Sequence, residues 1–304
     1  MPCYKPLQAF HAPGGISFDR SKSFGTPIEL PCGRCLGCRL EKSKQWALRC
    51  SHEAETHDGF NSFVTLTYRN DELPAGHTLV KKHFQKFIKS LRQKSKKKIR
   101  YYMCGEYGEA TEKNNYIARP HYHAILFGYQ FPDAYLSNLR NGLRVYRSPL
   151  LEKTWTKGTS EIGSVTFQSA AYVARYLLKK QNGEMAKNHY AIPDPETGEI
   201  NDDSPQRVPE YTNMSLKPGI GFDWYQKHKA DIFPHDYCIT PDGRKMQTPQ
   251  YYRDLLERDD PELHDQLKQV RVERAQNDPN NTPERLAVRE RCHTRKAEKL
   301  IRTL

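Results

Sequence analysis

Two histidines separated by one residue, His121 and His123, are the side chains in this sequence best suited to bind a metal ion. They lie in residues 119–128 (RPHYHAILFG), whose apolar and β-favouring composition predicts a strand. Side chains alternate along a strand, so both imidazoles project from one face together with Ile125 and Phe127. Such a pair on a rigid strand is suited to one divalent metal ion. The alternative is a histidine pair satisfied in the core or exposed as a surface stripe, because an isolated His-x-His motif is weakly specific.

The segment before this strand offers a third ligand. Residues 99–106 (IRYYMCGE) favour a second strand, and a polar loop joins it to the histidine strand. The simplest pairing of two such strands is an antiparallel hairpin. We expect this hairpin to bring Glu106 near His121 and His123 as an oxygen ligand. The alternative is an ordinary exposed acid in a turn.

A pair of tyrosines follows farther along the chain. Residues 168–180 (QSAAYVARYLLKK) predict a helix. Tyr172 and Tyr176 are four residues apart, which brings their Cβ atoms within about 5–6 Å on one helix face. Arg175 and Lys179 lie beside them, one turn apart. The alternative is two core tyrosines on an amphipathic helix.

Several elements must position these groups. Residues 63–68 (FVTLTY) predict a strand, and residues 80–93 predict a helix. A short helix is expected over about residues 133–141. Residues 162–167 (IGSVTF) predict a strand before the tyrosine helix, for which Ser169 is the expected N-cap.

The helix over residues 80–93 has one apolar and one basic face. No acid interrupts the basic face, which continues to residue 100. A charge run is commonly a solvated surface, but so one-sided a run favours contact with phosphates, which gives affinity without sequence information. The apolar stripe is Phe84, Phe87, Ile88 and Leu91. The expected DNA-binding residues are Lys81, Lys82, Lys86, Lys89, Lys96, Lys97 and Lys98, with Arg92, Lys94 and Arg100 in the same run.

Cysteines are concentrated near the N-terminus. Cys32, Cys35 and Cys38 form a Cys-x-x-Cys-x-x-Cys series, and intervening glycines permit the tight turns of a zinc knuckle. Either Cys3 or Cys50 is expected as the fourth ligand of a structural Zn²⁺ ion. The alternative is a set of reduced thiols packed near the start of the helix expected over residues 40–55.

Composition favours a nucleic-acid partner. The chain has 304 residues, 37% of them hydrophobic, with a formal net charge of +12 and a pI of about 9.2. Such a charge favours a polyanion. No apolar run approaches the length of a membrane span, so we expect no membrane partner. Without a signal peptide the protein is expected in the cytosol where it is made, and there eight cysteines favour metal binding or inert thiols over disulfides.

The last third of the chain differs in composition. From about residue 184, Pro, Asp, Asn and Glu predict a linker, and helices are expected over residues 251–258, 261–275 and 283–300. We therefore expect three regions, consisting of a Cys-rich, zinc-binding segment at 1–58, a core at 59–183 that carries the histidine and tyrosine pairs, and a linker with a charged helical region at 184–304.

Three blocks in order resemble the HUH endonuclease superfamily and specifically its rolling-circle replication initiators. Residues 63–68 resemble the first motif, residues 119–127 the metal motif, and residues 172–179 the nucleophile motif. Residues 3–7 (CYKPL) and 32–38 (CGRCLGC) are similar to the N-terminal part of the initiators of gokushovirus-like microviruses, which are small single-stranded DNA phages. The resemblance covers about residues 1–183.

The resemblance implies a fold and a chemistry. The fold is α+β, an antiparallel sheet with flanking helices like a ferredoxin- or RRM-like palm, here with a Cys-rich N-terminal segment and a helical C-terminal extension. His121, His123 and Glu106 match the ligands of a catalytic Mg²⁺ or Mn²⁺ ion. Tyr172 and Tyr176 match a two-tyrosine nucleophile, and Arg175 and Lys179 would stabilise the phenolate.

The implied reaction is nicking of one strand at the phage origin, with a 5′-phosphotyrosine link and a free 3′-OH, followed by rejoining. The implied partners are single-stranded DNA, origin DNA of the viral replicative form, and a host helicase and polymerase in the cytoplasm of a bacterial host. A single-tyrosine enzyme that uses Tyr172 or Tyr176 alone remains open. A relaxase or transposase of the same superfamily also remains open. So does a zinc-containing nucleic-acid-binding protein without catalysis, in which the bases of the bound nucleic acid would stack on the many aromatic side chains.

Overall fold

The computed structural model describes residues 3–108, 118–175, 184–194 and 196–298. Its chain divides into two compact units. The smaller comprises Met1–Gln45, Ile232–Cys238 and Gln247–Thr303, and the larger comprises Trp46–Asp231 and Ile239–Met246. Helix α1 (Leu36–Glu55) contributes its first half to the smaller unit and its second half to the larger.

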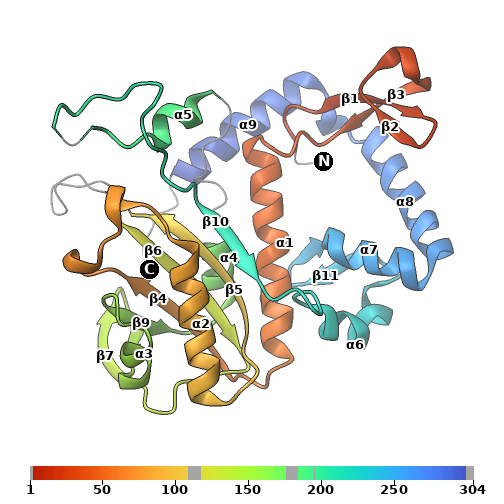
Figure 1. Cartoon of the computed structure of the whole chain (residues 1–304). Helices are drawn as coiled ribbons and strands as arrows, with labels where there is room; N and C mark the ends of the chain where they lie inside the picture. Colours follow the sequence, from red (N-terminus) through yellow and green to blue (C-terminus); the bar gives the residue numbers. More distant parts are fainter. Residues whose placement is uncertain (1–2, 109–117, 176–183, 195, 299–304) are drawn as a thin grey trace. The chain divides into compact units, whose positions relative to one another are not determined.

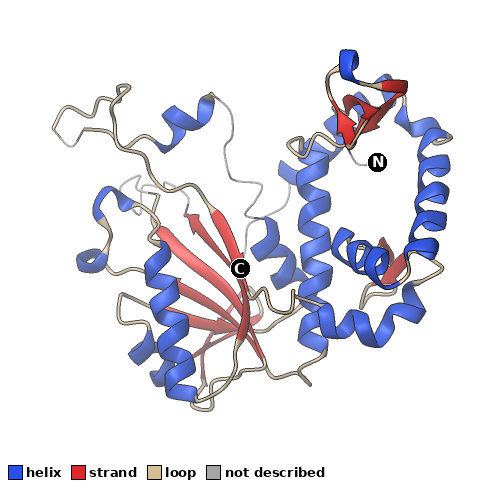
Figure 2. Ribbon diagram, turned by 45° about the vertical axis from the view of Figure 1, so that its right-hand side comes forward, coloured by secondary structure: helices blue, strands red, loops and turns tan. Residues whose placement is uncertain are grey.

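The larger unit contains a seven-stranded sheet in the order β10-β5-β6-β4-β9-β8-β7 (Figures 1 and 2). Every described strand pairing in it is antiparallel. The strand that carries the two histidines, β6, lies between β5 and β4 in the interior of the sheet. The strands are β4 (Asn61–Thr67), β5 (Arg100–Tyr107), β6 (Pro120–Phe127), β7 (Tyr135–Arg140), β8 (Leu143–Arg147), β9 (Ser160–Gly163) and β10 (Tyr211–Met214).

Helix α2 (Lys81–Ser95) covers one face of this sheet (Figure 1). Its predicted apolar stripe is buried, and it packs against side chains that point to the same face from the central strands. This cluster includes Leu66 of β4, Met103 of β5 and Leu126 of β6. Helix α3 (Pro149–Thr154) adds Leu151 to the same core.

The other face of the sheet packs against the second half of α1 and against α4 (Phe167–Arg175). Here Phe63, Tyr102 and Ile125 contact apolar residues of both helices. Buried Glu53 of α1 pairs with buried Arg100 at the start of β5 and also accepts a hydrogen bond from the backbone of Gly221 at 2.7 Å. The pair ties α1 to the sheet.

The smaller unit has its own sheet in the order β2-β1-β3, and its helices confirm the expected C-terminal ones. In this unit Arg271 donates to Asp236 at 2.8 Å, and the hydroxyl of Tyr4 contacts His293. The elements are β1 (Leu7–Ala12), β2 (Gly15–Ser17), β3 (Phe24–Leu30), α7 (Gln250–Asp259), α8 (Pro261–Gln276) and α9 (Pro283–Glu298). The remaining α-helices and strands in the described part of the chain are α5 (Met185–Tyr190), α6 (Phe222–Ile232) and a two-stranded sheet of β11 (Tyr237–Ile239) and β12 (Lys245–Gln247).

Two local predictions were wrong. The helix expected over residues 133–141 is instead the first strand of the β7–β8 hairpin. Asn141 and Gly142 form its turn with φ of 50° and 78°, the positive values that a two-residue hairpin turn requires. The strand expected over residues 162–167 ends at Gly163, and α4 already begins at Phe167.

The start of α4 also differs from the expectation. The hydroxyl of Thr166 accepts a hydrogen bond from the backbone N–H of Ser169 at 3.1 Å, and the hydroxyl of Ser169 accepts one from the N–H of Thr166 at 2.8 Å. The two side chains thus satisfy each other's backbone in a reciprocal arrangement. Thr166, rather than Ser169, is the capping residue.

The α+β class and the antiparallel sheet flanked by helices are as predicted from the sequence. No described helix has the length and apolar character needed to cross a membrane.

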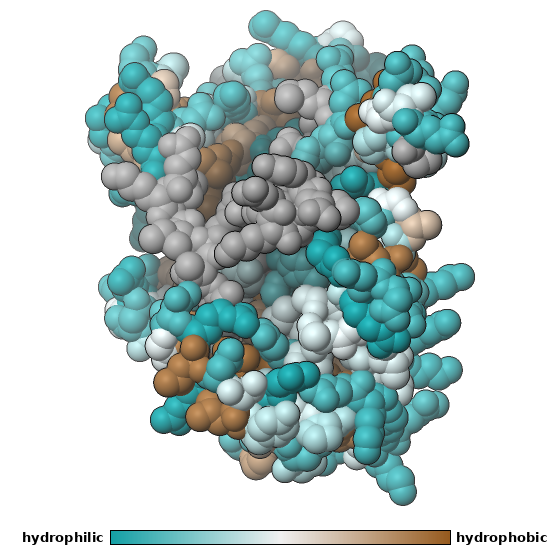
Figure 3. Space-filling view, turned by 90° about the vertical axis from the view of Figure 1, so that its left-hand side faces the viewer, coloured by the Kyte–Doolittle hydropathy of each residue, from teal (hydrophilic) through white to brown (hydrophobic). Residues whose placement is uncertain are grey.

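The face in Figure 3 is mainly hydrophilic, with hydrophobic side chains exposed chiefly in one group at its lower left. The division into regions 1–58, 59–183 and 184–304 stays a proposal.

Candidate active site

The predicted hairpin brings an acid and two histidines together. Strands β5 and β6 pair in a register that places Glu106 directly opposite His121 and Cys104 opposite His123. Oε1 of Glu106 lies 2.6 Å from Nε2 of His121 and 3.1 Å from Nε2 of His123. One ligand atom from each of the three residues lies within 4.8 Å of the others. The three side chains therefore converge on one point of the sheet.

Polar partners of the two Nδ1 atoms, on the far side of each ring from Glu106, fix the orientation of the imidazole rings. Nδ1 of His121 lies 3.1 Å from the carbonyl oxygen of Arg119, which only accepts, so Nδ1 carries the proton. Nδ1 of His123 lies 3.0 Å from the hydroxyl of Thr65 on β4. Both Nε2 atoms thus face Glu106, and a partner on the far nitrogen of each ring is the usual arrangement of metal-binding histidines.

The cluster is buried except for His121, which is partly exposed, and its charge is stabilised locally. Glu106 is 1% exposed and His123 is 5% exposed. Burial by itself would raise the pKa of Glu106, but the hydrogen bonds and charges of His121 and His123 outweigh burial and lower this pKa to about 2. A carboxylate that stays ionised beside two imidazole nitrogens fits a divalent cation with mixed oxygen and nitrogen ligands.

A tyrosine lies beside this cluster. Helix α4 packs through buried Ala170, Val173 and Ala174 against the same sheet face. This docking sets the ring of Tyr172 edge-to-face on His123, with centroids 5.2 Å apart. Of the other residues expected near the nucleophile, Tyr176, Lys179 and the side chain of Arg175 lie outside the described part of the structure.

The cysteine cluster forms with Cys3 as its fourth member. The sulfur atoms of Cys3, Cys32, Cys35 and Cys38 lie within 4.8 Å of one another. Backbone N–H groups donate to three of them, from Tyr4 to Cys35 at 3.4 Å, from Cys32 to Cys3 at 3.3 Å and from Cys35 to Cys32 at 3.2 Å.

Cys50, the other residue weighed as fourth ligand, is fully buried among apolar residues of the larger unit. Burial raises the pKa of the Cys38 thiol, whereas backbone donors outweigh burial at Cys32 and lower its pKa to about 7. Four convergent sulfurs fit a tetrahedral zinc ion, which binds thiolates.

The predicted DNA-binding lysines are all exposed, on α2 and just after it. Three other basic residues of the run are used elsewhere. Arg92 donates to the carbonyl of Ile99, Lys94 donates to the carbonyl of Lys153, and Arg100 is buried in its pair with Glu53. The exposed basic surface therefore contains fewer residues than the basic run in the sequence, because Arg92, Lys94 and Arg100 have partners within the protein.

Sequence reasoning missed the residues that position the site. Thr65 appeared only as part of a strand, and Arg119 contributes through its backbone carbonyl, which no side-chain pattern reveals. Strand β10 was also not predicted, although its pairing with β5 covers the edge of the strand that carries Glu106. For Thr65, its place opposite His123 in the β4–β6 register is the signal that would have found it.

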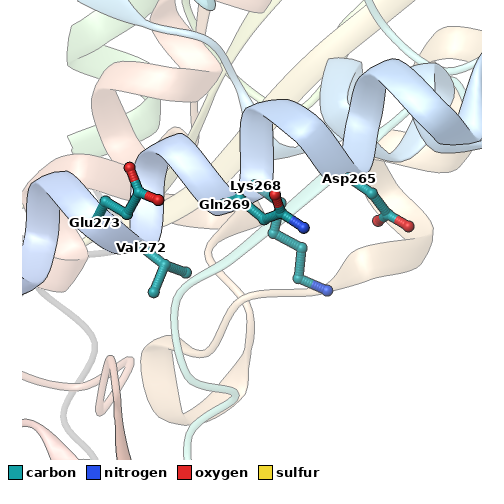
Figure 4. A pocket seen from close by; sticks show the side chains of 5 residues that line it. All are labelled: Asp265, Lys268, Gln269, Val272 and Glu273. Atoms are coloured by element: carbon teal, nitrogen blue, oxygen red, sulfur yellow. The ribbon is translucent and has the colours of Figure 1, made fainter.

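A surface hollow in the described structure lies away from these residues. It is a shallow depression of about 440 Å³ along α8, lined by Asp265, Lys268, Gln269, Val272 and Glu273. Figure 4 shows these side chains projecting from one helix rather than converging on a point. This hollow therefore offers no arrangement for chemistry, and the sheet face with the histidines remains the candidate site.

Comparison with known proteins gives a family for this arrangement. The model of the replication-associated protein ORF2/G2P family matches residues 61–181, the segment from β4 through the candidate site to the tyrosine helix. Replication-associated protein VP4 of Bdellovibrio phage phiMH2K is 31% identical over 275 residues, which cover 86% of this chain and 79% of that protein. This chain belongs to the family of phage replication-associated proteins.

Other members support the same assignment. Replication-associated protein ORF2 of Spiroplasma virus 4 is 30% identical over 85% of this chain and 81% of its own length. Replication-associated protein ORF4 of Chlamydia phage 1 is 28% identical over 79% of this chain and 56% of its own length. No solved structure matches this replication-associated protein. The resemblance to microvirus replication initiators that the sequence motifs indicated is confirmed at the level of the family.

Proposed function

We propose that this replication-associated protein initiates rolling-circle replication by cutting one strand of viral DNA at its origin, with tyrosine as the nucleophile. The observation that carries the proposal is the convergence of Glu106, His121 and His123 beside the ring of Tyr172 on one sheet face. A protein that only binds DNA has no need of this constellation.

The proposed cut is a transfer of the phosphoryl group to tyrosine. The phenolic oxygen of Tyr172 or Tyr176 attacks phosphorus, the bond from phosphorus to the 3′ oxygen breaks, and that oxygen takes up a proton to become a free 3′-OH. The phenol proton passes to solvent, so proton number balances. The 5′-phosphotyrosine conserves the energy of the phosphodiester, and attack by a 3′-OH rejoins the strand without ATP.

The residues of this chain would each have a part. Glu106, His121 and His123 would hold Mg²⁺ or Mn²⁺, which stabilises charge on the non-bridging phosphate oxygens. A phenol has an ordinary pKa of about 10, so its anion must be stabilised. We assign that role to Arg175 and Lys179. With Tyr172 and Tyr176 both active, one residue holds the 5′ end while the other cuts the regenerated origin.

Further parts of the proposal concern the surroundings of the site. The cysteine cluster holds a structural Zn²⁺ ion, and the exposed lysines of α2 contact DNA phosphates. The 3′-OH is extended by a host polymerase after unwinding by a host helicase, in the cytoplasm of the bacterial host.

A denaturing gel tests the proposal. Wild-type protein is mixed with labelled single-stranded viral DNA that carries the presumed origin, in the presence and absence of Mn²⁺. We expect a protein–DNA adduct that survives SDS and requires the metal. It should be lost in His123→Ala and in the double variant Tyr172→Phe/Tyr176→Phe, and the single variants identify which tyrosine cuts first.

Tyr135→Phe is the matched control, because Tyr135 lies half-exposed on the edge strand β7. It should form the adduct as the wild type does. Tight binding of origin DNA without adduct or nick under any divalent metal would refute the enzyme and leave the non-catalytic binding protein as the better description.

A further inference from the structure

The exposed lysines of α2 and the residues after it form a basic surface with no acid among them. We call Lys82, Lys86, Lys89, Lys96, Lys97 and Lys98 the α2 lysine surface. All six are exposed, and within the described part of the chain none of them forms an ion pair with a carboxylate. Lys81 is left out because its ammonium group lies 5.2 Å from the ring of Tyr211. Six exposed cations along one helix and just beyond its end, without counter-charges, favour a polyanion.

This surface lies on the opposite side of the sheet from the candidate active site. Helix α2 packs on the face formed by Leu66, Tyr122 and Leu126, whereas His121 and His123 point to the other face. Tyr122, between the two histidines, donates to the carbonyl of Val80 at 2.9 Å and accepts from its N–H at 3.0 Å, at the start of α2. The same three-residue motif thus separates the metal ligands from α2.

The separation is too large for one phosphate to reach both places. Packed layers of secondary structure lie about 10 Å apart. An α-helix with its side chains adds a diameter of about 10–12 Å, and the lysines occupy its outer side. Nucleic acid bound to the α2 lysine surface is therefore a different segment from the one at Glu106 and the histidines.

We infer that the α2 lysine surface is a second nucleic-acid site, which binds a phosphate backbone without regard to sequence while another segment occupies the active site. The inference rests on the proposed function for the location of the cut strand. Such a site would keep the protein on its template between cutting and rejoining. Its ligand chemistry is shared by single-stranded and duplex DNA, and separate binding series with each distinguish them.

A triple substitution provides the test. Lys82→Ala, Lys86→Ala and Lys89→Ala remove three charges from exposed positions of a helix, where alanine is favourable. The matched control removes the same charge from three exposed lysines outside α2, Lys42, Lys217 and Lys227. Thermal melts by circular dichroism check that both proteins remain folded.

Binding is measured by fluorescence anisotropy in EDTA over a series of salt concentrations. The probes are a long duplex, a long single strand, and a short origin oligonucleotide that spans only the cleavage site. We expect the α2 variant to lose about tenfold or more in affinity for one or both long probes. Its salt slope should fall by about 2–3, since each phosphate contact accounts for about 0.9 in duplex and about 0.7 in single-stranded DNA.

Cleavage separates the two sites. With Mn²⁺ and saturating protein, the α2 variant should cut the short oligonucleotide at the wild-type rate. In a separate binding experiment, wild-type protein saturated with the short oligonucleotide should still bind the long probe. Equal affinity of the α2 variant and the control for both long probes would overturn the inference, and so would displacement of the long probe by the short one. If no protein cuts DNA, the proposed function fails, while the binding series still decides whether this surface holds nucleic acid.

Discussion

The hydroxyl of Thr65 should set the metal affinity of the candidate active site although Thr65 is not a ligand. It lies 3.0 Å from Nδ1 of His123, where it can accept the Nδ1 proton when Nε2 binds a metal ion, and His123 is almost completely buried. Thr65→Val keeps the β-branched shape but removes the acceptor. Loss of a partner for a buried polar group costs about 1–3 kcal/mol. Loss of a hydrogen bond that orients a metal-binding histidine typically lowers metal affinity by about 10–100-fold.

Isothermal titration of the metal-free protein with Mn²⁺ measures the effect directly, without reliance on DNA cleavage. Thr67→Val is the matched control, because Thr67 follows on the same strand face but its hydroxyl contacts the hydroxyl of Thr159 at 2.6 Å instead of a histidine. We expect Thr65→Val to bind Mn²⁺ about 10–100-fold more weakly and Thr67→Val to bind it as the wild type does. Unchanged affinity in Thr65→Val, or an equal loss in both variants, would show that the hydroxyl does not position His123.

Three further predictions concern buried charges and the cysteine cluster. Glu106→Gln should abolish measurable Mn²⁺ binding in the same titration, because it removes the one anionic ligand of the predicted set. Glu53→Ala should lower the free energy of unfolding by about 3–5 kcal/mol in a urea melt, since it leaves buried Arg100 without its carboxylate, whereas exposed Glu55→Ala should cost less than about 1 kcal/mol. Burial opposes ionisation of Glu53, but its hydrogen bonds outweigh burial and lower its pKa. The contribution of Glu53 to the free energy of unfolding is therefore present above about pH 4.5 and decreases as the pH falls through the folded-state pKa. Urea melts from pH 7 to pH 3 should show this decrease in the wild type and not in Glu53→Ala. Cys38→Ser should lose zinc in a metal analysis, whereas Cys50→Ala should retain it despite its core position.

The geometry of the candidate metal ligands could be predicted because it depends on local pattern. Alternation along one strand places His121 and His123 together, and a hairpin pairs that strand with its neighbour in the sequence. In such a hairpin the end of β5 pairs with the start of β6, so Glu106 lies opposite His121. Whether these residues bind metal, and whether the tyrosines cut DNA, stays a prediction.

The β7–β8 hairpin could not be recognised from its apolar residues. Leu136, Leu139 and Leu143 follow the spacing of a helical stripe, yet in the structure they are more than half exposed on an edge hairpin. The informative signal was the turn pair Asn141-Gly142, which outweighs periodicity in so short a segment. Strand β10 escaped prediction for another reason, because four residues that pair with a strand about a hundred positions away have no local signature.

The His121-Tyr122-His123 motif shows why the structure is needed to decide which side of the sheet a group of residues serves. The sequence predicts both a basic helix and a pair of metal-binding histidines, and each alone suggests contact with DNA. Their relation depends on Tyr122, whose side chain points away from the histidines and anchors the start of α2 through the backbone of Val80. Alternation in His121-Tyr122-His123 therefore directs two side chains to the candidate metal site and the third to the helix behind it. Once α2 is docked there, its lysines lie beyond the reach of a phosphate bound at the histidines, so the proposed contact of these lysines with DNA requires a second segment of DNA.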